Sequence, residues 1–219
     1  MIPEDLKTYI EHEIIPRYAS FDRAHNLQHA ETVIKESLAL AARHPEADLR
    51  IVYTAAAYHD TGLCEGRENH HLVSGRMVAN DMHLRQWFSE EEILLIKEAV
   101  EDHRASARHE PRSIYGCIVA EADRIIDPDT TLQRTVQYGL KQNPSAGIDW
   151  HYRRFKAHLD EKYGPGGYLR LWLADSPNAA RLKKLQALIA DENTLRTTFE
   201  KMFEEEKLFP AFYQREGQK

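Results

Sequence analysis

Four residues in the first part of the chain could together bind a divalent metal ion. His59 and Asp60 are adjacent and follow a short apolar stretch, while His29 precedes them and Asp123 follows. Neutral imidazole and carboxylate groups are both good ligands for such ions. A single His-Asp pair occurs often by chance, and by itself it indicates only a solvated helix end. The interpretation therefore depends on the segments that must position these side chains.

Each of the four candidates lies on, or at the end of, a segment with the apolar periodicity of a helix. His29 shares a helix face with Val33 and Leu40, and Asp48 is a good N-cap for a helix that ends at His59-Asp60. Asp123 lies within a strongly apolar run, where a carboxylate is costly to bury unless it is paired or metal-bound. Alone, His29 could be a core histidine bonded to a carbonyl, and Asp123 could pair with a buried arginine. A shared cation would satisfy all four.

Helical patterns cover most of the remaining chain, and no run alternates long enough to predict a strand. Ser89 opens a capping box, and Ser113 caps a helix that we expect to end at Pro128. Further helices are predicted over 148–163, from Ser176-Pro177 and from Asp191-Glu192, the last with Leu195, Phe199, Met202 and Phe203 as its buried face. No linker rich in Gly or Ser divides the chain. We therefore predict one all-α domain, 1–219, with a core over about 20–130 and a C-terminal helical extension over about 131–219.

Composition limits the functional classes. The formal net charge is −6, which argues against stable nucleic-acid binding, and any anion site must be a local basic patch. No apolar run is long enough to span a bilayer, and the charged N-terminal stretch does not resemble a signal peptide. The two cysteines, Cys64 and Cys117, form no CxxC pattern. A cytoplasmic chain with reduced thiols and no membrane partner is the simplest interpretation.

The order and helical context of these residues resemble those of the HD-domain superfamily of metal-dependent phosphohydrolases. The strings HAETV, AAAYHDTGL and VAEADRIID are similar to its three defining segments, over roughly residues 20–130. The resemblance implies that His29, His59, Asp60 and Asp123 are the metal ligands in an HD-domain-like helical bundle. It also implies hydrolysis of a phosphoester or phosphoanhydride. We prefer His29 to His25 because only His29 puts the following apolar residues in register, which leaves His25 for contact with substrate.

Two further histidines could extend the site. His70 begins the helix after the His-Asp pair, and His103 lies seven residues after Ile96, on the same stripe. Some members of the superfamily hold a second metal with histidines from these helices, and the spacing to Ser74 favours His70 over His71. The alternative is that His70 and His103 bind a substrate phosphate. We therefore expect one or two ions of Mn, Mg, Ni, Co, Fe or Zn.

The site also needs cations for the phosphates of its substrate. Arg67 and Arg104 lie in loops next to the proposed histidines, and guanidinium groups match phosphate oxygens. Arg108 and Arg112 are interpreted as surface residues. Members of the superfamily often have a lysine shortly after the His-Asp pair, but none follows it here, so Arg67 is the nearest cation.

The favoured function is a metal-dependent phosphohydrolase acting on a small phosphorylated substrate such as a nucleotide. In it, Asp60, His59 and Asp123 would carry the catalysis, because Asp60 or Asp123 can orient the attacking water or accept its proton. Two alternatives stay open: a catalytically silent HD-type scaffold that binds a nucleotide or a protein, and a di-iron oxygenase on a similar fold. A scaffold has no need for Asp123 in an apolar helix.

Overall fold

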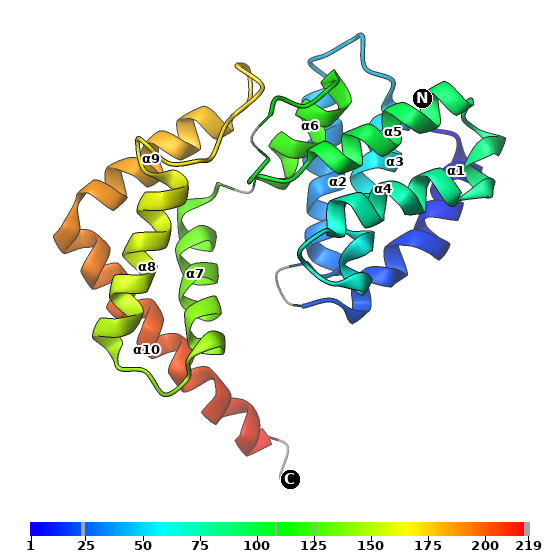
Figure 1. Ribbon diagram of the computed structural model, residues 1–219. Helices are drawn as coiled ribbons and strands as arrows, with labels where there is room; N and C mark the ends of the chain where they lie inside the picture. The colour runs from blue at the N-terminus through cyan, green and yellow to red at the C-terminus, as the bar shows by residue number, and fades with distance from the viewer. Residues whose placement is uncertain (23–24, 108, 125, 217–219) are drawn as a thin grey trace. The chain divides into compact units, whose positions relative to one another are not determined.

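The computed structural model describes residues 1–22, 25–107, 109–124 and 126–216, and within these ranges every regular element is a helix (Figure 1). This confirms the all-α prediction. The α-helices are α1 (Glu4–Tyr9), α2 (Leu27–Ala41), α3 (Leu49–Tyr58), α4 (His70–Asn80), α5 (Glu90–Asp102), α6 (Ile114–Asp123), α7 (Pro128–Gln142), α8 (Ile148–Tyr163), α9 (Asn178–Ala190) and α10 (Glu192–Glu216). A π-helix, η1 (Ile10–Ile14), and three 3₁₀ helices, η2 (Ile15–Ser20), η3 (Thr61–Glu65) and η4 (Met82–Gln86), complete the elements. None of the described helices combines the length and the apolar character that crossing a bilayer requires.

The helices gather into two compact units. The first consists of Met1–Arg124 and Arg170–Ser176, and the second of Ile125–Leu169 and Pro177–Lys219. Glu121 explains why a late segment joins the first unit, because this buried α6 carboxylate accepts hydrogen bonds from the Trp172 backbone N–H and from the Ser176 hydroxyl. The boundary after Arg124 lies close to the expected end of the core. That the whole chain forms a single domain stays a prediction from the sequence.

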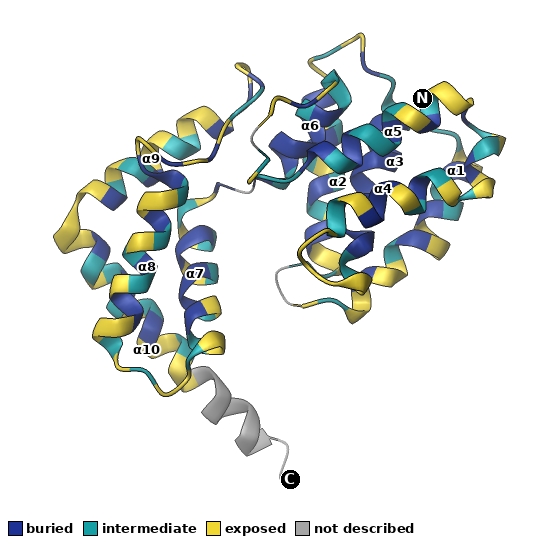
Figure 2. Cartoon of the chain, in the orientation of Figure 1, coloured by how far each residue is buried: buried dark blue, intermediate teal, exposed yellow. Residues whose placement is uncertain are grey.

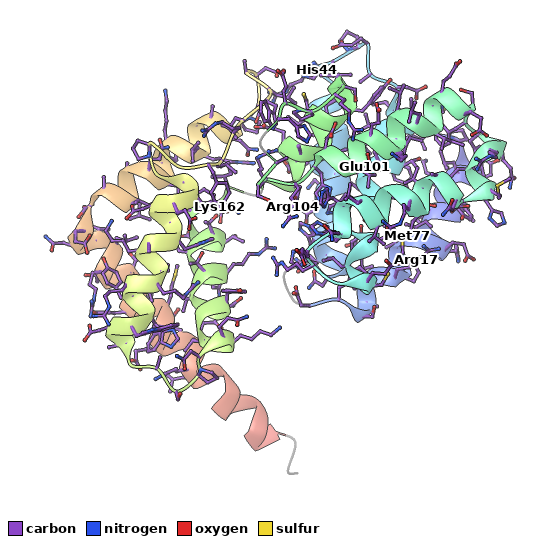
Figure 3. The ribbon with its side chains drawn as sticks, viewed as in Figure 1. Arg17, His44, Met77, Glu101, Arg104 and Lys162 are labelled. Atoms are coloured by element: carbon purple, nitrogen blue, oxygen red, sulfur yellow. The ribbon has the colours of Figure 1, made fainter. Side chains whose placement is uncertain are left out.

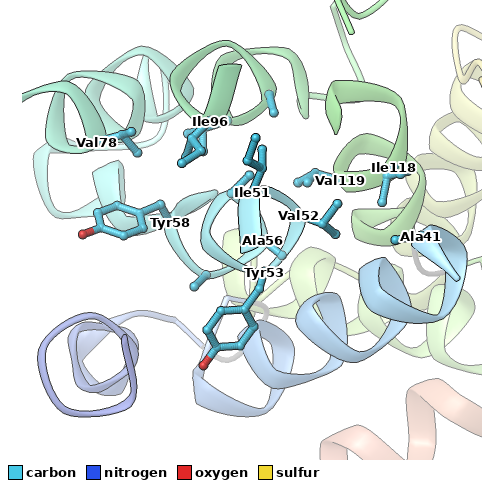
Figure 4. Packing of buried hydrophobic residues seen from close by; sticks show 14 of the residues in the cluster. Ala41, Ile51, Val52, Tyr53, Ala56, Tyr58, Val78, Ile96, Ile118 and Val119 are labelled. Atoms are coloured by element: carbon cyan, nitrogen blue, oxygen red, sulfur yellow. The ribbon is translucent and has the colours of Figure 1, made fainter. Parts of the chain in front are cut away.

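Helix α3 lies at the centre of the first unit. Every residue from Ile51 to Tyr58 is buried, so this helix is covered on all sides (Figures 2 and 4). The run Ala55-Ala56-Ala57 carries side chains small enough for neighbouring helices to approach closely. Around it pack residues of α4, α5 and α6, among them Val78, Ile96, Ile118 and Val119 (Figure 4). The packing fixes the C-terminal end of α3, where the His-Asp pair begins.

Local signals in the sequence predicted most helix starts and missed one helix. Asp48, Ser89 and Ser113 each accept a hydrogen bond from a backbone N–H in the first turn, and Ser89 forms the complete capping box with Glu92. The expected end of the sixth helix was wrong. Helix α6 ends at Asp123, and Pro128 opens α7, which the sequence analysis did not predict. Proline is favoured in the first turn of a helix because the N–H that it lacks has no intrahelical partner there.

The second unit contains α7 to α10. The α10 residues Leu195, Phe199 and Phe203 are buried as predicted, whereas Met202 is only partly buried. Aromatic rings dominate this interior: the rings of Phe155 and Phe199 have centroids 5.0 Å apart. This unit is built by apolar packing, whereas the first unit also buries a group of histidines and aspartates.

Candidate metal centre

Three separate helices bring the four predicted ligands together. His29 comes from the first turn of α2, His59 and Asp60 directly follow α3, and Asp123 is the last residue of α6. The Nε2 atoms of His29 and His59 are 3.2 Å apart. Asp123 Oδ1 lies 3.2 Å from His29 Nε2 and 3.9 Å from His59 Nε2. We call His29, His59 and Asp123 the first ligand set.

His70 and His103 form a second group beside the first. Their Nε2 atoms are 3.2 Å apart, and they lie 3.3 Å and 3.5 Å, respectively, from Asp60 Oδ1. We call these two histidines the second ligand set. The other oxygen of Asp60, Oδ2, faces the first set, at 3.3 Å from His59 Nε2 and 3.5 Å from His29 Nε2. One buried carboxylate therefore divides its two oxygens between two groups of histidines.

The spacing of these atoms suits metal coordination. Ligand atoms about 2.0–2.2 Å from one ion, at right or tetrahedral angles to one another, lie roughly 3.0–3.6 Å apart. Most distances in both sets fall in this range. Potential ligand atoms of His29, His59 and Asp123 all lie within 4.8 Å of one another, and so do those of Asp60, His70 and His103. Both groups could hold an ion.

Backbone carbonyls orient three of the imidazole rings. The Nδ1 atoms of His59, His70 and His103 lie within hydrogen-bonding distance of the carbonyl three residues earlier, at 2.7, 2.9 and 2.5 Å. A carbonyl can only accept, so each Nδ1 carries a proton, and a neutral ring in this orientation presents its Nε2 lone pair. The Nε2 atoms of all three rings lie within 3.5 Å of an Asp60 oxygen. This is the arrangement that ligands to a cation require.

The charges of the centre are arranged to attract a cation. Burial by itself lowers the pKa of His29, but hydrogen bonds and charge from Asp123 and Asp60 raise it to about 9. Burial by itself raises the pKa of Asp60 and Asp123, but the surrounding histidines lower both well below the ordinary carboxyl value. Both carboxylates therefore stay ionised, and a proton on His29 supplies positive charge. A divalent ion would supply that charge instead and displace the proton.

The comparison with known families agrees with this geometry. Residues 26–126 match the family model of the HD domain, a span that contains every residue of both ligand sets and Asp60. Residues 26–126 therefore form an HD domain. HD domains bind divalent metals, and the superfamily typically consists of metal-dependent hydrolases. No curated protein and no solved structure was found to match the chain.

Two residues that the sequence analysis did not single out hold the His-Asp turn of the HD domain in place. The hydroxyl of fully buried Tyr18 donates to the Ala57 carbonyl at 2.9 Å and accepts from the Asp60 backbone N–H at 3.2 Å. Gly62 lets α4 approach, because a Cβ atom there would lie 2.2 Å from the carbonyl oxygen of His70. A glycine after a His-Asp pair is visible in the sequence. A tyrosine forty residues away carries no local signal of this role.

His25 lies outside the first ligand set, and its contact with substrate stays a prediction. Its Nδ1 bonds to Asp22 Oδ1 at 2.7 Å, and its Nε2 lies 3.4 Å from Arg67 Nη2. The His25 ring nevertheless packs edge-on against the His29 ring, with centroids 5.9 Å apart. The predicted substrate residues His25 and Arg67 thus lie together beside the HD-domain centre.

The other predicted histidines and arginines differ in their surroundings. Arg104 donates to the backbone carbonyl of Glu68 at 2.6 Å. Glu68 belongs to the loop that leads to His70. His71 forms no ion pair with Asp60 among the described residues, whereas His70 does. Burial, together with charge from His103, lowers the pKa of His71 to about 4. Arg112 is more than a surface residue, because its guanidinium contacts both oxygens of buried Asp102, next to His103. Arg108 lies outside the described residues.

Proposed function

We propose that this HD-domain protein is a metal-dependent phosphohydrolase. It cleaves a phosphoester or phosphoanhydride bond of a nucleotide or similar small phosphate compound. His29, His59, Asp60 and Asp123 are the proposed metal ligands. The observation that carries the proposal is the position of Asp60, whose Oδ2 faces the first ligand set while its Oδ1 faces the second. A scaffold protein gains nothing from burying, fully or in large part, five ionisable side chains around one carboxylate, because each is costly to desolvate.

The residues of the centre have separate tasks in this proposal. A bound divalent ion supplies positive charge for the phosphate and a water of lowered pKa. Asp123 has the most exposed side chain of the first set, at 22%, which supports a role in orienting the attacking water or accepting its proton. His59 has no exposed side-chain surface, and it fixes the position of the ion from the buried side of the centre. Asp60 stays ionised and links the two sets.

The second ligand set is proposed to hold a second cation. Three features of His70 and His103 support this choice: Nδ1 atoms that donate to backbone carbonyls, Nε2 atoms only 3.2 Å apart, and a carboxylate oxygen close to both. When both rings are neutral, two Nε2 lone pairs at this distance repel each other, and a shared cation would relieve that repulsion. Binding a substrate phosphate instead would require protons on Nε2, which is the alternative role of this pair.

Positive charge for the substrate phosphates comes from the rim of the centre. Arg67, whose side chain is 63% exposed, lies beside His25, and Arg104 follows His103 directly. We propose that Arg67, Arg104 and His25 contact the substrate. A cytoplasmic location belongs to the same proposal, and both cysteines are free thiols, as that environment favours.

One alternative has an observation in its favour. A di-iron oxygenase on a similar fold needs the extra histidines as ligands, and the structure brings His70 and His103 to Asp60. The two functions differ in the metal and in the reaction. An oxygenase would purify with iron and consume dioxygen, whereas the phosphohydrolase would release phosphate or a phosphomonoester without dioxygen.

The test combines metal analysis with activity. The purified full-length chain is assayed with Mn²⁺, Mg²⁺, Ni²⁺, Co²⁺, Fe²⁺ or Zn²⁺ against nucleotides, cyclic nucleotides and artificial phosphodiesters, with Asp60→Ala as the variant. We expect metal-dependent hydrolysis that chelation removes. Asp60→Ala should lower it by more than about 100-fold, because even residues that only orient metal ligands contribute 10–100-fold. Full activity and metal content in Asp60→Ala, or no hydrolysis of any of these compounds by the metal-loaded chain, would overturn the proposal.

A further inference from the structure

A pocket of about 650 Å³ lies in the first unit, and no residue of either ligand set lines it. Its volume falls within the roughly 300–1,000 Å³ of small-molecule sites. One wall comes from α4, the other from the N-terminal segment and the residues after α4; the residues used below are Tyr9, Arg17, Val73, Arg76, Met77 and Asp81. Figure 3 labels two of the lining residues, Arg17 from η2 and Met77 from α4.

The carboxylates of this pocket are largely engaged, whereas one guanidinium is not. Asp81 Oδ2 accepts hydrogen bonds from the hydroxyls of Tyr9 and Tyr58, both at 2.5 Å. Arg76 pairs with Glu65 at 3.1 Å. Arg17 uses only its Nε, which donates to the backbone carbonyl of Glu13, so within the described part of the chain its two terminal nitrogens have no partner. Unused guanidinium donors at a pocket wall favour an anionic group.

The rest of the wall favours a flat ring. The Tyr9 ring stacks against the His83 ring, with centroids 5.3 Å apart, packs at a tilt against the Trp87 ring at 5.6 Å, and bonds to Asp81 through its hydroxyl. Val73 and Met77 supply apolar surface from α4, and a methionine thioether packs well on aromatic rings. Exposed Glu13 also lines the pocket, and its negative charge disfavours a ligand with many negative charges.

We infer that this pocket binds a small organic anion that combines one planar aromatic group with one weakly charged acidic group. The ring packs on Val73 and Met77, beside the Tyr9–His83 pair, and the acidic group bonds to Arg17. A nucleoside monophosphate and an aromatic carboxylate share this chemistry. The pocket uses α4, the helix that begins with His70, but the inference does not depend on the proposed hydrolase activity.

Calorimetric titration of the full-length chain tests the inference. The probes are adenosine monophosphate, benzoate, adenosine, which lacks the charge, and inorganic phosphate, which lacks the ring. The variants are Arg17→Ala, Asp60→Ala, which removes the metal centre, and the control Arg153→Ala, which removes an exposed arginine of the second unit. Circular dichroism checks that each variant is folded.

Binding of adenosine monophosphate, benzoate or both should weaken at least tenfold in Arg17→Ala, since a charge-assisted hydrogen bond contributes about that factor. It should persist in Asp60→Ala and Arg153→Ala. If both probes bind, the pocket accepts nucleoside monophosphates and aromatic carboxylates alike. If only one binds, the ligand belongs to the class of that probe. The inference is overturned if neither probe binds, if Arg17→Ala binds as the wild type does, or if binding disappears only in Asp60→Ala.

Discussion

The first and second ligand sets surround the same carboxylate but are built differently. The first combines two histidines with a second carboxylate, Asp123, and the pKa of His29 in it is raised to about 9. The second has two histidines and no carboxylate of its own. In the second set, backbone carbonyls orient both rings through Nδ1, whereas Nδ1 of His29 in the first set has no partner among the described residues.

This difference predicts an order of affinity. Two carboxylates around one ion give a stronger electrostatic attraction than one, so the first set should hold its ion more tightly. The second set is positioned in advance by its carbonyl bonds, but it offers less negative charge. The first ion would then be retained through purification, and occupancy of the second would depend on the metal concentration.

The largest expected effects on this comparison come from variants that each remove one proposed ligand from one of the two sets. Asp123→Ala should lower metal-dependent hydrolysis by more than about 100-fold and release the tightly held ion. His103→Ala should reduce bound metal from about two ions per chain toward one while the first ion is retained. Elemental analysis of both variants beside His12→Ala, which changes an exposed histidine outside both sets, gives the measurement.

Two other outcomes would contradict this prediction. If His103→Ala keeps the metal content of the wild type but raises KM or lowers kcat, His70 and His103 bind a substrate phosphate rather than an ion. If Asp123→Ala leaves both metal and activity unchanged, the comparison of the two sets fails.

The parts of the molecule also differ in how far the sequence alone predicts them. Local signals predicted the all-α fold and the starts of several helices, because caps such as Ser89 act within one turn. The helix α7 was missed because Pro128 can either end one helix or begin the next. Apolar context marked Asp123 as unusual. The division of the Asp60 oxygens, and the bond from Tyr18 to the His-Asp turn, depend on tertiary packing and have no sequence pattern.

A second prediction concerns metal removal and pH. In the metal-free chain the pKa of His29 is raised from its ordinary 6.5 to about 9, so its proton stabilises the fold fully below about pH 6.5. That stabilisation is lost as the pH rises toward 9. The pKa values of Asp60 and Asp123 are lowered, so their contribution is present above about pH 4 and is lost on acidification.

A bound divalent ion replaces the proton on His29, so the stabilisation by metal should increase from pH 6.5 to pH 9. The measurement is the difference in Tm between the metal-loaded and EDTA-treated chain at several pH values in this range. In His29→Ala the difference should be smaller and depend less on pH. A difference that is constant with pH in the wild type would show that no ligand proton is exchanged for the ion.

The smallest expected effect comes from Tyr18→Phe. The change leaves the aromatic packing intact but removes the hydroxyl that bonds to the Ala57 carbonyl and the Asp60 N–H. We expect roughly tenfold weaker metal binding, the lower end of the range for residues that only orient ligands. Unsatisfied buried groups should also cost about 1–3 kcal/mol of stability. Tyr115→Phe is the matched control, since the Tyr115 hydroxyl also accepts from a backbone N–H, that of Asp48, away from both sets. Both variants should lose stability, but only Tyr18→Phe should lose metal affinity. Equal metal affinity in the two variants would limit Tyr18 to supporting the fold.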